Sequence, residues 1–458
     1  MYEWQGKNCA VVGLGVSNIP VIRFLLQHGA KVTGRDSKTA DELGERYQIL
    51  QELGIHCLLG HDYLQGLTDY DYIFLTPGIP KHLPEIQEVI AKGKVLSEIE
   101  LVLSYAKAPV FAITGSSGKT TTTTLVGKML EASGVDCYVG GNIGQPLIEK
   151  VVDIPAEAII VLELSSFQLE LLKQSPDGAL VTNISENHLD IHLTMDNYIR
   201  AKKQIYLHQS PEQVLVLNYD DPLAEEMAEE AASQVYYFSM NEQVAQGTYL
   251  ENDVLYYTDQ AGKVEIIHRS EIGLIGEHNV ANMLAAALFA HLAGASWEAI
   301  RQVAREFTGV PHRLEKVAVL DGVTYYNDSI ATSPSRAIAG LKAFSAPLIL
   351  IAGGYDKQLS FDELAKEISQ RVKDLILIGE TGPKIKKAME DLAKEQGRIT
   401  TVLHETDTLA QAVKLASRLA KPGDVVLLSP ASASFDMYPS FVARGEHFRH
   451  LVRELESK

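Results

Sequence analysis

The clearest candidates for chemistry lie in one glycine-rich loop, Thr114-Gly-Ser-Ser-Gly-Lys-Thr-Thr121. Glycines let backbone N–H groups curl around phosphates, and the N-terminus of a following helix adds partial positive charge. In such a loop Lys119 can reach the outer phosphates, and the Thr120 hydroxyl can bind Mg²⁺. The usual spacing places a glycine where this chain has Ile113, so the loop is a shorter variant. The residues predicted to hold a nucleotide are Gly115, Ser116, Ser117, Gly118, Lys119, Thr120 and Thr121.

A second glycine pattern occurs near the N-terminus, in Gly13-Leu-Gly-Val-Ser-Asn18. It resembles the dinucleotide-binding fingerprint, with Asp36 at the end of the next predicted strand. The third glycine of that fingerprint is replaced by Asn18, and a lone Gly-x-Gly is weak evidence for NAD. An NAD(P)-dependent oxidoreductase therefore stays open as an alternative, although the phosphate loop argues against it.

Strands and helices alternate along the chain and predict the elements that position these loops. An apolar strand and an amphipathic stretch flank each glycine pattern, as in crossover connections of parallel sheets. Short strand-like runs between 235 and 272 predict an antiparallel addition. The sequence thus predicts an α/β protein of three domains. They are a Rossmann-like domain at 1–107, a central mononucleotide-binding domain at 108–308 and a Rossmann-like domain at 309–458.

Composition excludes several classes of function. The chain has 458 residues, 59 acidic against 41 basic side chains and a formal charge of −18, which argues against nucleic-acid or anionic-membrane binding. The N-terminus shows no signal-peptide pattern, and the apolar stretch from 281 to 295 is shorter than a membrane span. Cys9, Cys57 and Cys137 lack metal-ligand spacing, as expected for reduced thiols in a cytoplasmic protein.

Seven motifs, in order, make the chain resemble the Mur ligase family from Gly13 to about Arg444. They are Thr114-Gly-Ser-Ser-Gly-Lys-Thr-Thr, Gly140-Gly-Asn-Ile-Gly, Glu163-Leu-Ser-Ser-Phe-Gln-Leu-Glu, Asn183-Ile-Ser-Glu-Asn-His-Leu-Asp, His278-Asn-Val-Ala-Asn, Pro311-His-Arg-Leu-Glu and Asn327-Asp-Ser. Each is weak alone, but seven in the right order are specific. Gly353-Gly-Tyr-Asp-Lys and Ser429-Pro-Ala-Ser-Ala-Ser-Phe-Asp resemble the family member that adds D-glutamate.

The resemblance implies an ATP- and Mg²⁺-dependent amide ligase that joins D-glutamate to UDP-N-acetylmuramoyl-L-alanine, acting as a cytoplasmic monomer. In such a ligase the substrate carboxylate takes the γ-phosphate of ATP, and the incoming amine then displaces phosphate from the acyl phosphate. That chemistry needs cations around the phosphates and an amine held in line. Other family ligases, such as an L-alanine-adding enzyme or a folylpolyglutamate synthase, stay open, as does a non-catalytic regulator.

The resemblance also assigns roles to residues around the nucleotide. Glu163, His188 and a carbamylated Lys202 match metal ligands together with Thr120, although the neighbouring Lys203 could be the modified residue instead. Arg313 matches a γ-phosphate ligand from the third domain, which implies domain closure. Asn279 and Asn282 lie one helical turn apart and are expected to face adenine, and Asp328 is expected to accept a hydrogen bond from the ribose. The residues expected to act in catalysis are Lys119, Glu163, His188, Lys202 and Arg313.

The resemblance assigns the UDP-sugar to the first domain, with two residues of the second domain completing the site, and D-glutamate to the third domain. The residues expected to bind the UDP-sugar are Val16, Ser17, Asp36, Ser37, Gly78, Asn142 and Ser165. Those expected to bind D-glutamate are Thr332, Lys357, Ser434, Phe435 and Phe441. The sequence departs from the family at Ile330, where a lysine is usual. A cation is therefore missing from the amino-acid site as the pattern describes it.

Overall fold

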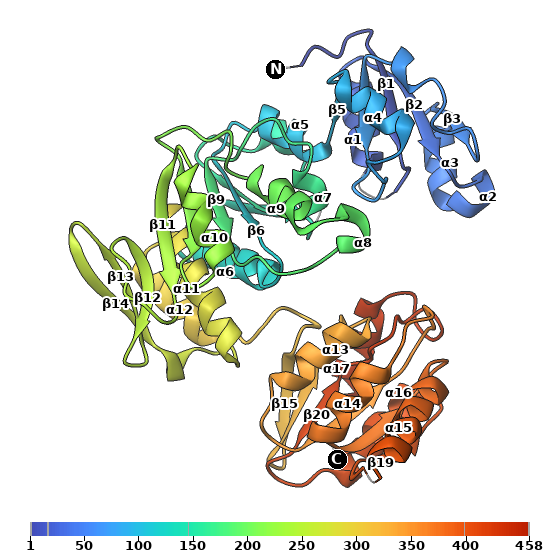
Figure 1. Cartoon of the computed structure of the whole chain (residues 1–458), viewed down its shortest axis with the longest axis vertical. Coiled ribbons are helices and arrows are strands. Elements are labelled where there is room, and N and C mark those ends of the chain that lie inside the picture. Colours follow the sequence, from blue (N-terminus) through green and yellow to red (C-terminus); the bar gives the residue numbers. More distant parts are fainter. Residues whose placement is uncertain (1, 16–17, 145, 398, 457–458) are drawn as a thin grey trace. The chain divides into compact units, whose positions relative to one another are not determined.

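The computed structural model describes residues 2–15, 18–144, 146–397 and 399–456, with the side chains of Asp190 and Gln396 left aside. Its strands form three sheets of five, nine and six strands, and each sheet falls inside one of the three predicted ranges (Figure 1). The contacts divide the chain into two compact units. One holds residues up to Ile272 together with 277–306, and the other holds 273–276 and the chain from Phe307 onward.

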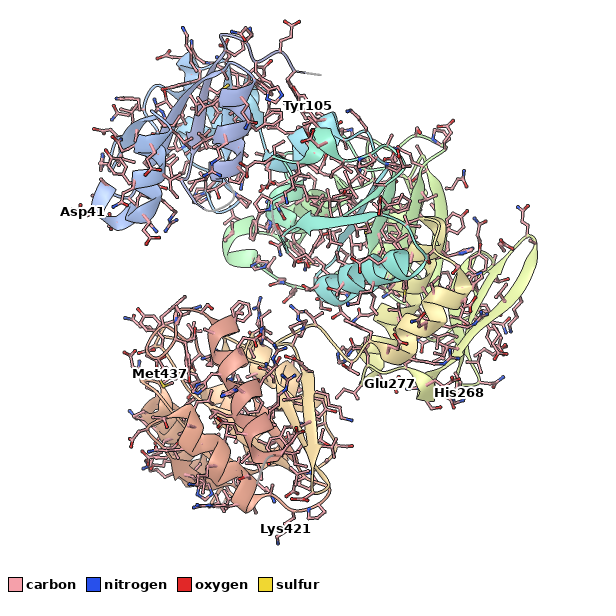
Figure 2. The ribbon with its side chains drawn as sticks, turned by 180° about the vertical axis from the view of Figure 1, so that it is seen from behind. Asp41, Tyr105, His268, Glu277, Lys421 and Met437 are labelled. Carbon is pink, nitrogen blue, oxygen red and sulfur yellow. The ribbon has the colours of Figure 1, made fainter. Side chains whose placement is uncertain are left out.

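The first sheet is parallel, in the order β3-β2-β1-β4-β5, as predicted for a Rossmann-like domain. Its strands are β1 (Asn8–Val12), β2 (Lys31–Asp36), β3 (His56–Leu59), β4 (Tyr72–Leu75) and β5 (Val95–Leu96). Its helices are α1 (Asn18–Gln27), α2 (Ala40–Leu43), α3 (Glu45–Glu52), α4 (Pro84–Ala91) and α5 (Glu98–Tyr105). The last of these ends at Tyr105, labelled in Figure 2, whose hydroxyl accepts a 2.7 Å hydrogen bond from Trp4 Nε1.

The second sheet has the order β14-β13-β12-β11-β10-β9-β6-β8-β7. Its strands are β6 (Val110–Thr114), β7 (Cys137–Gly141), β8 (Ile159–Glu163), β9 (Gly178–Val181), β10 (Val214–Asn218), β11 (Gln234–Ser239), β12 (Gly247–Glu251), β13 (Val254–Asp259) and β14 (Gly262–His268). Its helices are α6 (Lys119–Ala132), α7 (Ser166–Leu169), α8 (Leu189–His192), α9 (Met195–Lys203), α10 (Pro222–Glu225), α11 (Glu277–Leu292) and α12 (Trp297–Glu306). The last three strands pair antiparallel with one another and extend the sheet at one edge, which confirms the predicted addition (Figure 1).

The third sheet has the order β15-β16-β20-β17-β18-β19. Its strands are β15 (Glu315–Leu320), β16 (Val323–Asn327), β17 (Leu348–Ala352), β18 (Val372–Leu377), β19 (Val402–Glu405) and β20 (Val425–Leu428). Its helices are α13 (Pro334–Lys342), α14 (Asp362–Arg371), α15 (Gly382–Gln396), α16 (Leu409–Leu419) and α17 (Phe441–Glu456). The antiparallel pair β15–β16 is not among the predicted strands. β15 is an edge strand that is at most half-buried, so it lacks the continuous apolar run that marks a buried strand in the sequence.

Apolar cores lie on both faces of the sheets, as expected for parallel strands covered by helices. Among the described residues, no helix is both long and apolar enough to cross a membrane.

Candidate functional site

The phosphate loop connects β6 to α6 and is packed so tightly that its glycines cannot be replaced. Gly115 has φ +146°, and a Cβ built there would lie 1.8 Å from Thr182 Oγ1. Gly118 has φ +81°, and a Cβ there would lie 2.3 Å from Asn282 Oδ1. Both backbone conformations favour glycine. In addition, the side chains of Thr182 and Asn282 occupy the space that a Cβ at Gly115 and at Gly118 would need. The loop is therefore held against the ends of β9 and α11, with its backbone free of side chains at the two bends.

Lys119 is the first residue of α6, and its ammonium folds back over the loop. Its Nζ donates hydrogen bonds to the carbonyl oxygens of Gly115 at 2.8 Å and of Ser116 at 3.3 Å. The positive charge thus lies at the N-terminus of a 14-residue helix, where the helix dipole also favours anions. The structure thus places the Lys119 ammonium at the loop, and its binding of a phosphate stays a prediction.

Glu163 ends β8, in register with Ile113 of β6, so it stands next to the strand that leads into the loop. Its side chain is 1% exposed, and Oε1 accepts a 2.8 Å hydrogen bond from Asn142 Nδ2. Oε2 is buried and has no hydrogen-bond partner among the described residues. A buried, unpartnered carboxylate oxygen costs free energy unless a cation or donor meets it, so this oxygen fits a Mg²⁺ ligand.

The described residues contain no group of three His, Cys, Asp or Glu side chains that could hold a metal alone. A hard cation at Glu163 would therefore need hydroxyl and phosphate oxygens as further ligands, which Thr120 and a nucleotide supply.

Lys202 lies on α9 with its ammonium buried against the phosphate loop. Its side chain is 1% exposed, and Nζ donates to the Gly115 carbonyl oxygen at 2.8 Å and to Thr114 Oγ1 at 3.3 Å. Burial, and then repulsion from Lys119, hold the pKa of Lys202 well below its ordinary value. Lys203 points elsewhere and forms an ion pair with Glu230 at 2.5 Å. The geometry thus favours Lys202 over its neighbour as the residue that acts at the loop.

An aromatic cluster that the sequence did not reveal joins this lysine to the loop. The Lys202 ammonium lies 4.8 Å from the Tyr198 ring centre, and the Tyr198 hydroxyl is 2.8 Å from Ser116 Oγ. The buried His192 packs edge-on against Tyr198 and stacks on Phe167 with ring centres 5.0 Å apart. His192 Nε2 also lies 2.9 Å from the Oγ of Ser166, which begins α7 shortly after Glu163 in the chain. Through these contacts the cluster connects the phosphate loop, α9 and the segment that follows β8.

The predicted ligand His188 precedes α8 and has a left-handed backbone, with φ 54°. Its side chain is exposed, and its ring centre is 5.0 Å from that of Phe167. Asn279 and Asn282 lie on one face of α11, as predicted. Their amides bond one another, with Asn282 Nδ2 donating to Asn279 Oδ1 at 3.0 Å.

The N-terminal glycine pattern borders a cavity of about 410 Å³. Asp36 does not line this cavity, because its carboxylate accepts hydrogen bonds from the backbone N–H groups of Leu14 at 2.7 Å and Lys38 at 2.9 Å. It therefore shapes the loop beside the cavity. Of the residues predicted to bind the UDP-sugar, Asn142 lines the cavity, whereas Ser37, Gly78 and Ser165 do not. Val16 and Ser17 lie outside the described residues.

In the second unit, Asp328 lies at the end of β16 and is buried. Ser429 Oγ donates to its carboxylate at 2.8 Å, and the Leu314 backbone N–H donates at 3.3 Å. Burial raises the pKa of Asp328 to about 7, against the lowering effect of these hydrogen bonds and of Arg313. Arg313 is half-buried in the same loop region. The charge of Arg313 thus acts on the carboxylate of Asp328, so these two residues, both predicted to bind the nucleotide, lie near each other in this unit.

Of the residues predicted to bind D-glutamate, Lys357, Ser434 and Phe435 lie on two loops of the third sheet that meet each other, and Phe441 begins α17. The Tyr355 backbone N–H donates to the Ala433 carbonyl oxygen at 2.9 Å, which brings the Lys357 segment beside Ser434. Ser434 is buried, Thr332 and Phe441 are half-buried, and Lys357 is exposed. Phe435 is 64% exposed, and its ring centre is 5.9 Å from that of Tyr355.

One fully buried cation ties these loops together. The Arg444 guanidinium donates hydrogen bonds of 3.0 Å to Ser329 Oγ and to the carbonyl oxygens of Ser329, Ser432 and Ala433. Burial lowers the pKa of Arg444 to about 10. This role has no local sign in the sequence, because Arg444 and its partners are separated by up to 115 residues.

A cationic side chain, Arg336, lies next to the Ile330 loop, although the motif pattern does not include this residue. Arg336 Nη1 donates to the Ile330 carbonyl oxygen at 3.4 Å, and its charge lowers the pKa of Asp328. The missing lysine is thus partly replaced by an arginine six residues further on.

A phosphate loop on the central of three α/β sheets, with an acidic strand end and a buried lysine beside it, defines a nucleotide-dependent enzyme. Residues 7–97 match the MurD-like N-terminal domain of Mur ligases, 113–290 the Mur ligase middle domain, and 312–432 the Mur ligase glutamate ligase domain. The chain belongs to the Mur ligase family, as the sequence predicts, and the oxidoreductase alternative is not supported.

Individual relatives match over almost their whole length. The chain is 49% identical to the UDP-N-acetylmuramoylalanine–D-glutamate ligase of Symbiobacterium thermophilum, over 98% of each chain. It is 44% identical to the enzyme of the same name from Acetivibrio thermocellus, over 99% of this chain and 97% of that one. The crystal structure of UDP-N-acetylmuramate–alanine ligase from Thermotoga maritima shares the fold, with a TM-score of 0.57 at 18% identity over 99% of this chain and 100% of that one.

Proposed function

We propose that this protein is the ligase that uses ATP and Mg²⁺ to join D-glutamate to UDP-N-acetylmuramoyl-L-alanine in cytoplasmic peptidoglycan precursor synthesis, acting as a monomer. The observation that supports it most is the central site, where Lys119, Glu163 and Lys202 surround one phosphate loop. The 49% identity to a D-glutamate ligase over nearly the full chain supports the choice of substrates.

Different residues of this site are proposed to bind the phosphates and the metal ion. The loop N–H groups and Lys119 hold the ATP phosphates, so that the terminal phosphoryl group can pass to the carboxylate of the UDP-sugar substrate. Mg²⁺ held by Thr120 and Glu163 would offset the phosphate charge. The neutral amine of D-glutamate then attacks the activated carbonyl, phosphate leaves, and the amine proton passes to solvent or a nearby base.

Lys202 is proposed to act in its carbamylated form. Burial favours the neutral form of the Lys202 amine. A neutral amine can add carbon dioxide, losing one proton and becoming an anionic carbamate. The carbamate oxygens would then replace a buried ammonium by a ligand for a second cation, shared with His188.

The test is to measure phosphate release by the full chain with UDP-N-acetylmuramoyl-L-alanine and a panel of D- and L-amino acids. Release that depends on D-glutamate supports the proposal. Release that depends instead on L-alanine and UDP-N-acetylmuramate, or on a folate with L-glutamate, would assign the chain to another ligase of the family.

A further inference from the structure

The 410 Å³ cavity beside the N-terminal glycine pattern has a specific charge arrangement. Among the described residues that line it, Lys81 is the single cation and Glu98 the single carboxylate. The other polar lining side chains are neutral, from Asn18, Thr76, Ser97, Asn142 and Gln168. Lys81 is therefore the one described side chain of the lining that can offer a full positive charge to a ligand.

Lys81 is a partly buried cation that no carboxylate neutralises directly. Its Nζ donates a 2.8 Å hydrogen bond to the Pro77 carbonyl oxygen, and it has no ion pair within the described chain. Burial lowers the pKa of Lys81, and the more distant Glu170 carboxylate raises it in part. A partly desolvated ammonium with only a carbonyl partner becomes more stable when an anion reaches it.

The remaining features of the cavity also suit an anion. Gly15 and Asn18 line it at the point where the ten-residue helix α1 begins, so the N-terminal end of that helix faces the cavity. The residues that the motif pattern assigns to the UDP-sugar include no lysine or arginine. A diphosphate bound by those residues alone would lack a side-chain cation.

We propose that Lys81 binds the diphosphate of the nucleotide-sugar substrate, from within the cavity that Asn142 and the start of α1 also line. This inference rests on the proposed function, because it takes the substrate to be a UDP-sugar. It adds a binding residue that the family motifs do not include.

Titration calorimetry of the full chain with UDP and with uridine tests the assignment, because the two ligands differ by the diphosphate. Lys81→Ala is expected to weaken UDP binding about 10- to 100-fold, as for the loss of one charge-assisted hydrogen bond, and to leave uridine binding unchanged. Lys81→Arg should remain within a few-fold of the native protein. Lys92→Ala is the matched control, since Lys92 follows α4 on the surface and pairs with Glu88 at 2.7 Å.

Three results would overturn the assignment. Equal losses for UDP and uridine would give Lys81 a structural role, and unchanged binding of both UDP and the full substrate would remove it from the site. Weaker binding of the full substrate with unchanged UDP binding would place Lys81 at the sugar-peptide end. Failure of the native protein to bind UDP would instead overturn the proposed substrate class, so the two failures are distinguishable.

Discussion

The Lys202 ammonium donates a 2.8 Å hydrogen bond to the carbonyl oxygen of Gly115, the first glycine of the phosphate loop. The two residues are 87 positions apart in the chain. Gly115 packs so closely against Thr182 that a Cβ would not fit there, so the backbone of Gly115, including the carbonyl oxygen that Lys202 bonds, has little room to move. Chemistry at Lys202 is therefore coupled directly to the shape of the nucleotide site.

We expect Lys202→Ala to be nearly inactive and to regain part of its activity when short carboxylic acids are added. The acid oxygens would occupy the place of the carbamate oxygens. Initial rates with and without acetate measure the effect, and Lys203→Ala, whose lysine pairs with Glu230, is the control. An active, metal-loaded enzyme whose crystallographic density shows an unmodified Lys202 would exclude the carbamate.

Lys119→Ala should lower kcat by about two to three orders of magnitude, the scale for removing one preorganised donor to transition-state charge. Circular dichroism checks that the variant is folded. Lys128→Ala on the same helix is a suitable control, because Lys128 is exposed to solvent. Near-normal turnover by folded Lys119→Ala would remove the loop lysine from the mechanism.

Substrate binding should depend on pH through Glu98, which lines the same cavity as Lys81. Burial raises the pKa of Glu98 to about 7, although the backbone N–H groups of Ile148 and Leu147 lower it in part. Below this pH the side chain is neutral, and above it the carboxylate repels the substrate diphosphate. The KM for the UDP-sugar should therefore rise several-fold as pH increases through 7. In Glu98→Gln this rise should disappear, and a profile identical to that of the native enzyme would contradict the assignment.

Lys357→Ala should raise the KM for D-glutamate far more than the KM for ATP, because the exposed ammonium would contact only the amino acid. The preference for D-glutamate over D-glutamine should fall by roughly 1.5–3 kcal/mol, the free energy of a charge-assisted hydrogen bond. L-Lysine and meso-diaminopimelate should be poor substrates for the native enzyme. Lys384→Ala serves as control, since Lys384 pairs with Asp356 beside Lys357. A variant with weaker ATP binding and unchanged use of D-glutamate would place the amino-acid site elsewhere.

Arg444→Met should lower the free energy of unfolding by about 3–5 kcal/mol, because it leaves several buried acceptors without their charged donor. Urea unfolding monitored by fluorescence measures this. Arg453→Met, on the exposed side of the same helix, should change it by less than about 0.5 kcal/mol. Equal stability of the two variants would show that the Arg444 hydrogen bonds contribute little.

The parts of the site that the sequence predicts are those built by neighbouring residues. The phosphate loop needs a strand, glycines and a helix in succession, and Glu163 needs only to end an apolar strand, so both have local signatures. The pairing of β15 with β16 had weaker signals, because an edge strand carries fewer apolar residues.

Contacts between distant segments could not be predicted in this way. Asn279 and Asn282 have the right spacing, but only the structure shows that their amides bond each other. Local patterns also do not reveal that His192 lies beside Ser166, that Lys81 lines the cavity, or that Arg336 bonds the Ile330 carbonyl oxygen. Helical periodicity gives the face on which a side chain lies, whereas its partner depends on how separate segments pack.

The Arg444 hydrogen bonds also set an order of events while the protein is being made. Ser329 leaves the ribosome 115 residues before the arginine that binds it, and the Ser432 and Ala433 carbonyl oxygens leave 12 and 11 residues before. The phosphate loop and its partners Lys202 and Asn282 have all been synthesised by then. Since domains generally fold in the order of synthesis, a nascent chain acquires its nucleotide site before the loops proposed for D-glutamate are fixed. Translation arrested ahead of α17 would therefore leave a chain with an assembled phosphate loop and an unfinished acceptor site.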